Sequence, residues 1–156
     1  RTTGCPAQRQ DCAGACDEEI GMRIGFLVTD DETERAGYTT LRLAMTAINR
    51  GHEVWFINAG DLAFDTDERV RAWARTTAGK KYKNTASYLK VLKSEKARLE
   101  RKTVDELDRL MWRSDPGDEA GQRAWAKTGG SLFGAVAVRS GGIVLNVPTG
   151  VEGAID

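Results

Sequence analysis

Histidine and cysteine are almost missing from the part of this chain that reads as a folded domain. The 156 residues contain one histidine, His52, and three cysteines, Cys5, Cys12 and Cys16. His52 lies in "NRGHEVW", a turn that leads into a strand. Such a turn lies at the amino edge of an open sheet, opposite to the edge where ligands bind. We therefore predict a structural role for His52, and a Ser-His-Asp or Cys-His catalytic arrangement is excluded.

The cysteines do not form a familiar metal-binding pattern. Their spacing is C-x6-C-x3-C with no histidine nearby, whereas zinc sites favour four ligands in tight C-x2-C pairs. We predict no metal site. From Met22 onward the chain has no cysteine, which predicts a fold without disulfides in the reducing cytoplasm.

A net charge and long apolar runs are also missing. Lysine plus arginine and aspartate plus glutamate both number 23, so the formal net charge is zero and no basic footprint for nucleic acid is present. No apolar run reaches the roughly 18 residues that a membrane helix requires. An apolar fraction of 40% predicts an ordinary globular domain.

The composition divides the chain into unequal parts. Residues 1–21 hold all the cysteines and few large apolar residues, and we predict a disordered or artefactual leader there. Residues 22–150 read as one α/β domain. Residues 151–156 read as the start of a further region. Because the first residue is arginine and not methionine, we expect a fragment of a longer protein.

The text from Met22 onward predicts a strand, a helix and a second strand. Met22–Thr29 and Glu53–Asn58 are short apolar runs typical of buried strands. Between them one helical face is apolar, formed by Leu41, Ala44, Met45 and Ile48. Thr39 or Thr40 suits the start of this helix, and Gly51 suits its left-handed end. A βαβ unit of this kind implies parallel strands.

The remaining chain continues an α/β pattern. Residues 61–75 suggest a hairpin or an extended excursion that turns near 65–67, followed by a short helix over Thr85–Leu92. The later elements predicted are a strand over Leu107–Trp112, a helix over Ala120–Arg139 with Trp125, Leu132, Phe133 and Val136 on one face, and a strand over Ile143–Asn146. We predict an open, mainly parallel α/β sheet of about four to five strands with flanking helices.

The stretch Gly79–Val104 is rich in lysine and arginine. Such a stretch is typical either of a polyanion-binding site or of a solvated charged surface. Glu95 and Glu100 dilute its charge and favour the solvated surface.

Polar residues gather where the predicted strands end. In open α/β sheets ligands bind beyond the carboxyl ends of the strands, and four such ends are 30–31, 58–61, 113–115 and 146–150. Arg113 offers a planar donor fork that suits a carboxylate or phosphate. The alternative is that Arg113 pairs with Asp115 or Asp118, which cap the next helix.

Familiar nucleotide and nucleophile motifs are missing at these ends. The loop after the first strand, "TDDETERAGY", is not G-x-G-x-x-G, and neither a P-loop nor a G-x-S-x-G elbow occurs. Asp30 and Asp31 are also placed as in phospho-acceptor receiver domains, but the later aspartate and lysine of those domains have no counterpart.

Three stretches resemble the N-terminal domain of bacterial glutathione synthetases and related ATP-grasp ligases. They are "MRIGFLVTD…YTTLRLAMTAINRGHEVWFINAGDLAFD", "VDELDRLMWRSDPGDE" and "GGIVLNVPTGVEGAID". The second is similar to a family strand that ends in Met-Arg-Lys-Asp-Pro-Pro, and the third to Val-Asn-x-Pro-x-Gly-Leu. The positions that match are Arg113, Asp115, Pro116, Asn146, Pro148 and Gly150. The family's Asp-Pro-Ile after the first strand is Asp30-Asp31-Glu32 here, and only Thr40 is comparable in the segment before the helix.

The resemblance implies a Rossmann-like pre-ATP-grasp domain, the substrate side of an ATP-dependent carboxylate–amine ligase. A separate ATP-grasp domain would hold ATP and Mg²⁺, phosphorylate a carboxylate and let an amine attack the acyl phosphate. The substrate-binding residues implied are Arg113, Asp115, Asp30, Thr40 and Asn146. No catalytic residue is expected in this chain, which would be inactive alone. The partners implied are the small substrates and the ATP-grasp domain, with a homo-oligomer also open.

Two other functions are compatible with the sequence. One is a stand-alone domain that binds a ligand or a partner. The other is the N-terminal lobe of a glycosyltransferase-like enzyme, because "RGHEVWFI" also resembles a stretch near the start of many such enzymes.

Overall fold

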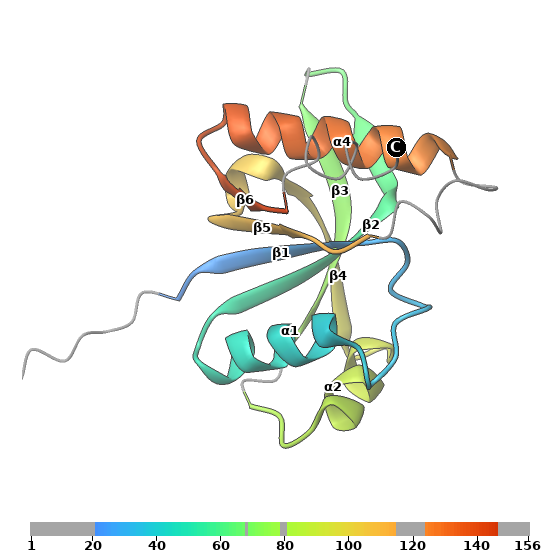
Figure 1. The fold of residues 1–156 in the computed structure, drawn as a ribbon, viewed down its shortest axis with the longest axis vertical. Helices are drawn as coiled ribbons and strands as arrows, with labels where there is room; N and C mark the ends of the chain where they lie inside the picture. Colours follow the sequence, from blue (N-terminus) through green and yellow to red (C-terminus); the bar gives the residue numbers. More distant parts are fainter. Residues whose placement is uncertain (1–20, 68, 79–80, 115–123, 147–156) are drawn as a thin grey trace, which may run out of the picture.

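A six-stranded mixed sheet forms the centre of the molecule (Figure 1). The computed structural model describes residues 21–67, 69–78, 81–114 and 124–146. The strands follow the spatial order β4-β3-β2-β1-β5-β6. The strands are β1 (Arg23–Val28), β2 (Glu53–Phe64), β3 (Val70–Thr77), β4 (Ala97–Thr103), β5 (Arg109–Trp112) and β6 (Ile143–Leu145). The helices are α1 (Thr39–Asn49), α2 (Thr85–Leu92) and α4 (Ala124–Arg139), with a 3₁₀ turn, η1, at Val104–Glu106.

The strand directions confirm the predicted fold class. β1 pairs in parallel with β2 on one side and with β5 on the other, and β5 pairs in parallel with β6. The antiparallel part is a meander of β2, β3 and β4 at one edge. The predicted turn near 65–67 is confirmed, since Phe64 pairs with Val70 and the Asp65 amide donates to the Arg69 carbonyl at 3.0 Å.

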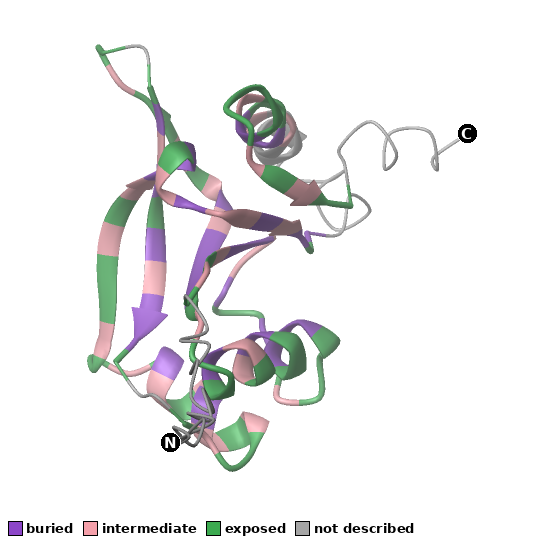
Figure 2. Cartoon of the chain, turned by 90° about the vertical axis from the view of Figure 1, so that its left-hand side faces the viewer, coloured by how far each residue is buried: buried purple, intermediate pink, exposed green. Residues whose placement is uncertain are grey.

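Helices cover both faces of the sheet, as Figure 1 shows with α4 on one side and α1 and α2 on the other. The alternation of β1 supplies both layers, because successive side chains of a strand point to opposite faces. Leu27 belongs to the cluster under α4, whereas Phe26 and Val28 belong to the cluster under α1 and α2. Figure 2 shows the buried residues concentrated between these layers.

α1 begins differently from the prediction. Its N-cap is Tyr38, whose side chain makes no capping hydrogen bond, and the predicted caps Thr39 and Thr40 lie inside the helix. Thr40 is buried with the predicted apolar residues Leu41, Ala44 and Ile48, because it falls on the same helical face. The predicted left-handed turn is confirmed by Gly51, which has a φ of 91°.

His52 lies at the amino edge of the sheet, as predicted. Its Nδ1 accepts a hydrogen bond from the Met22 amide at 3.4 Å. The Glu53 amide donates to the Met22 carbonyl at 2.9 Å beside it. The imidazole therefore helps to join the starts of β1 and β2.

The buried face of α4 is shifted relative to the prediction. Phe133 and Ala137 are buried and Val136 packs against them, but Leu132 is 50% exposed. Leu132 precedes Phe133 by one residue, about 100° around the helix, so with Phe133 and Ala137 directed at the sheet Leu132 lies toward the side of the helix. A Cβ added to Gly129 would lie 3.5 Å from Leu62 Cδ1 and 3.7 Å from the Ala59 carbonyl oxygen, so α4 approaches β2 closely there. Residues 120–123 of the predicted helix and the side chain of Trp125 lie outside the described residues.

The basic stretch contains a strand that the sequence analysis missed. β4 consists mostly of charged residues, as an exposed edge strand can. It therefore lacks the apolar alternation from which a strand is predicted. Several of its cations pair with nearby acids. Arg101 contacts Asp65 at 3.1 Å, and Lys102 contacts Glu100 at 3.1 Å.

Candidate functional site

The carboxyl ends of four parallel strands meet at one edge of the sheet. β1, β2, β5 and β6 all run in the same direction, so the residues that follow them share this edge. The loop over residues 29–38 follows β1 and leads to α1. Two groups of polar side chains form at this edge, one around Asp31 and one around Arg113.

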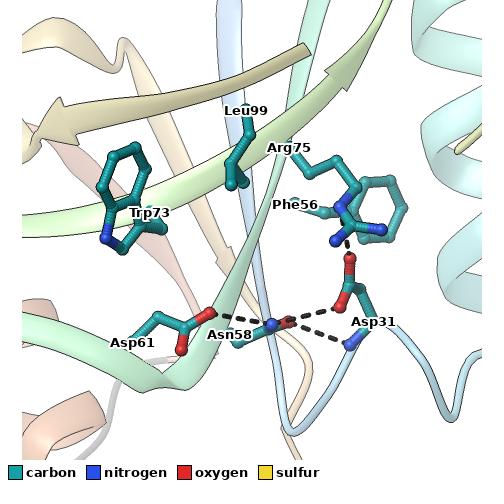
Figure 3. A pocket seen from close by; sticks show the side chains of 7 residues that line it. All are labelled: Asp31, Phe56, Asn58, Asp61, Trp73, Arg75 and Leu99. Atoms are coloured by element: carbon teal, nitrogen blue, oxygen red, sulfur yellow. Dashed lines mark hydrogen bonds and ion pairs between the residues drawn. The ribbon is translucent and has the colours of Figure 1, made fainter. Parts of the chain in front are cut away.

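The first group is a hydrogen-bonded network that joins the loop after β1 to β2 and β3 (Figure 3). The Asn58 amide nitrogen donates to Asp31 at 3.1 Å and to Asp61 at 3.0 Å. The Asn58 carbonyl oxygen accepts from the Asp31 amide at 2.9 Å. Arg75 of β3 places its Nε 3.0 Å from the other Asp31 carboxylate oxygen. Asp31 is buried, and this ion pair balances its charge.

The same network fixes the loop between β1 and α1. Arg75 Nη1 lies 3.6 Å from the Glu32 carboxylate, and the ammonium of Lys93 donates to the Glu32 carbonyl at 2.5 Å. Asp30 Oδ1 accepts from the Glu32 amide at 2.9 Å. Cations from β3 and from the end of α2 therefore hold a loop that is remote from both in sequence.

The second group brings Arg113 and Thr40 together. Arg113 follows β5, and its Nε donates to the Thr40 hydroxyl at 3.3 Å. Its backbone amide donates to the Leu27 carbonyl at 2.7 Å, which continues the ladder between β5 and β1. Thr40 is in the first turn of α1, whose N-terminus has no side-chain cap and no acidic residue. The uncapped N-terminus carries a partial positive charge, and Arg113 adds a full one.

Glu34 is buried between these groups. It is 8% exposed, and its Oε2 has no hydrogen-bond partner in the described part of the chain. Burial raises the pKa of the Glu34 carboxyl, and the nearby Arg113 and Lys93 oppose that rise, while Asp31 adds to it. The loop thus places a buried carboxyl beside the cations of the edge.

The other predicted site residues have different positions. Asn146 follows β6, with a φ of 61°, and its side chain donates to the Trp112 carbonyl at 3.0 Å. That contact supports the backbone immediately before Arg113. Asp30 lies in the loop beside Asp31. Asp115 lies outside the described residues, as does Asp118, so neither the proposed capping nor its pairing with Arg113 is tested.

A pocket of about 260 Å³ opens next to the Asp31 network. Phe56, Trp73 and Leu99 form its apolar walls, and the polar wall is the network itself (Figure 3). The lining residues are Asp31, Phe56, Asn58, Asp61, Trp73, Arg75 and Leu99.

Glu34, Arg75, Lys93 and the aromatic wall were not predicted from the sequence. A signal for Arg75 was present, because Arg71, Trp73 and Arg75 alternate along "VRAWARTT" and therefore share one face of a strand. Lys93 had no such signal. Its contact with the loop depends on the packing of α2 beside α1.

The described residues contain neither a metal-binding cluster nor a helix suited to a membrane. No three of their His, Cys, Asp or Glu side chains come together in a way that would hold a metal ion. Among the helices described, none has the length and apolar character required to cross a bilayer.

The fold and its polar carboxyl edge define an open α/β domain with a candidate ligand-binding edge. A comparison with protein families matches residues 22–151 to the prokaryotic glutathione synthetase N-terminal domain. The chain therefore belongs to the family of prokaryotic glutathione synthetase N-terminal domains. None of the curated proteins matches the chain.

Proposed function

We propose that this chain is the substrate-side domain of an ATP-dependent carboxylate–amine ligase, and that Arg113 and Thr40 bind the substrate carboxylate. The family membership supports the reaction class and favours it over the glycosyltransferase-like alternative. The observation that carries the binding role is the 3.3 Å hydrogen bond from Arg113 to Thr40 at the uncapped start of α1.

The chemistry of this corner suits an anion. A guanidinium donates in a planar fork that matches a carboxylate, and the free amides of a helix N-terminus attract negative charge. Arg113 is exposed, so a ligand has access to it. Asn146 steadies the strand end that presents Arg113, through its bond to Trp112. Asp30 and Asp115 remain proposed members of the same site.

In the full-length enzyme, ATP and Mg²⁺ would be held by the ATP-grasp domain. The described part of this chain offers no group of carboxylates suited to hold the metal. The role left to the domain is to bind and orient the carboxylate that becomes phosphorylated. Such orientation lowers the activation free energy, because the reacting groups lose their translational and rotational freedom before the reaction begins.

The first test is Arg113→Ala in the full-length protein. We expect it to abolish ligase activity, since a charge-assisted contact to the substrate is lost, and to leave Tm nearly unchanged. Amine-dependent ADP release measures the activity, first with γ-glutamylcysteine and glycine, the two parts joined by the last peptide bond of glutathione. Arg113→Lys keeps the charge without the fork, and we expect an intermediate loss.

The matched control is Arg109→Ala. Arg109 begins β5, the strand that Arg113 follows, and lies at the amino edge of the sheet, where its guanidinium donates to the Asp108 carbonyl at 2.7 Å. We expect this variant to keep full activity. A large fall in the Tm of Arg113→Ala would show instead that Arg113 is a structural capping residue, and unchanged activity would refute its binding role.

A further inference from the structure

The pocket beside the Asp31 network has an unusual combination of walls. Trp73 is 45% exposed and Leu99 is 54% exposed, and both lie on the face of the β3–β4 edge that α1 and α2 leave open. Phe56 also lines the pocket and belongs to the core under α1 and α2. Figure 3 shows Asp31, Asn58 and Asp61 across the pocket from Leu99, while Arg75 lies beside Leu99 and reaches toward Asp31.

The polar wall is held rigidly. The side-chain nitrogen of Asn58 donates to two carboxylates, and its side-chain oxygen accepts from a backbone amide. These three hydrogen bonds fix the orientation of the Asn58 side chain. Preorganised polar groups in an otherwise apolar pocket are what orients a small ligand. The pocket volume of about 260 Å³ suits a ligand of small-amine or amino-acid size.

The charges of the wall do not cancel. Asp31 is paired with Arg75 at 3.0 Å. Asp61 is exposed and accepts one hydrogen bond from the neutral Asn58 amide, and it forms no ion pair with another described residue. The lining therefore carries two carboxylates and one guanidinium, which leaves a net negative charge at Asp61.

The Trp73 ring of the wall contacts one cation, Arg101, whose charge is balanced by Asp65. The Arg101 guanidinium already lies 5.8 Å from the centre of the Trp73 ring, which is the geometry of a cation–π contact. A cation with an apolar stem would find a counter-ion in Asp61 and an aromatic or aliphatic surface in Trp73 and Leu99.

We propose that this pocket is a binding site for a small organic ammonium ligand, whose charged group pairs with Asp61 and whose apolar stem lies on Trp73 and Leu99. The inference goes beyond the proposed carboxylate site and does not rest on it. The two sites use different residues, since Arg113 and Thr40 take no part in the pocket.

The test compares three probes of similar shape and different charge on the full-length protein. They are 2-phenylethylamine, which is a cation at pH 7, neutral 2-phenylethanol and anionic 3-phenylpropanoate. We expect calorimetry to show the amine binding about tenfold more tightly than the alcohol, the typical effect of a hydrogen bond to a charged group. The acid should bind most weakly.

Two variants locate the site. Asp61→Asn keeps the shape and the contact with Asn58 but removes the charge, so the amine should bind only as well as the alcohol. Trp73→Ala should weaken both. Asp105→Asn is the control, because it removes an exposed carboxylate that lies outside this pocket, with its side chain 55% exposed.

Three results would overturn the inference. They are equal binding of amine and alcohol, an equal loss of amine binding in Asp61→Asn and Asp105→Asn, and no amine binding at about 10 mM. Sedimentation is measured alongside. Dimers that Trp73→Ala dissociates would show that the exposed apolar wall is a subunit interface, which also refutes the ligand site. Since the carboxylate site is tested by Arg113→Ala, failure of one proposal leaves the other standing.

Discussion

At the scale of single residues, the carboxyl edge depends on how buried charges are compensated. Asp31 is buried with a guanidinium 3.0 Å away, so its charge is balanced inside the protein. Glu34 is buried without such a contact, and one of its oxygens lacks a partner among the described residues. Burying a carboxylate without a direct partner costs free energy, which is why burial raises the pKa of Glu34.

The Glu34 carboxyl should therefore make stability depend on pH. Because its pKa in the folded state is raised, its contribution is fully present below the unfolded-state pKa and is lost as pH rises through the folded-state pKa. We expect Glu34→Gln to raise Tm at pH 7 and to leave it unchanged at about pH 4, where the native group is already protonated. Thermal unfolding at both pH values measures this, with the exposed Glu95→Gln as control. A lower Tm of Glu34→Gln at pH 7 would mean that attraction to Arg113 and Lys93 outweighs burial.

At the scale of elements, the two helices on one face begin in different ways. α1 starts without a side-chain cap, at the corner where Arg113 lies. α2 starts with Asn84, whose Oδ1 accepts from the Ser87 amide at 2.8 Å. The capped helix is stabilised locally, whereas the uncapped one leaves its N-terminal amides for another partner.

The cap of α2 has a measurable consequence. We expect Asn84→Ala to lower the free energy of unfolding by about 0.5–2 kcal/mol, since the first-turn amides lose their acceptor. Asn84→Asp keeps an acceptor oxygen and should restore most of that loss. Urea unfolding followed by circular dichroism measures both. Equal stability of the alanine and aspartate variants would contradict a role for the cap.

At the scale of the whole molecule, one sheet supports two cores. Leu27 faces α4 and Leu41 of α1 lies in the opposite core, and each is fully buried. Because β1 lies at the middle of the sheet and contributes to both layers, loss of packing on one face should weaken the other.

We predict one cooperative unfolding transition for the 156-residue chain. Leu27→Ala and Leu41→Ala should each lower stability by about 2–5 kcal/mol, the typical cost of a cavity in a core. Tryptophan fluorescence, which includes the buried Trp55 and Trp112 under α4, and far-ultraviolet circular dichroism should give the same midpoint for each variant. Leu43→Ala, on the exposed side of α1, is the control and should change little. Separate midpoints for the two probes would show that the layers unfold independently.

The sequence alone determined the parts of this protein that depend on local periodicity and turn chemistry. The parallel strands, α1, α2 and the turn at Gly51 follow from apolar spacing and a glycine at a left-handed position, and these act within a few residues. The position of Arg113 at a strand end followed from the same pattern. β4 was not predicted because an edge strand can be charged along its length. Leu132 was wrongly placed on the buried face of α4, because apolar character alone does not show which of two neighbouring residues, about 100° apart on the helix, faces the sheet.

Only the tertiary structure decided which side chains meet. Arg75 reaches Asp31 because β3 returns antiparallel beside β2, and Lys93 reaches the loop carbonyl of Glu32 because α2 packs beside α1. The contact between Arg113 and Thr40 spans 73 residues of sequence. No local pattern encodes such distances, since they result from how the sheet orders its strands and how helices cover it. The sequence thus placed polar residues at one edge, and the packing of the sheet and its helices arranged them into two groups, one around Arg113 and one that lines the pocket beside Asp31.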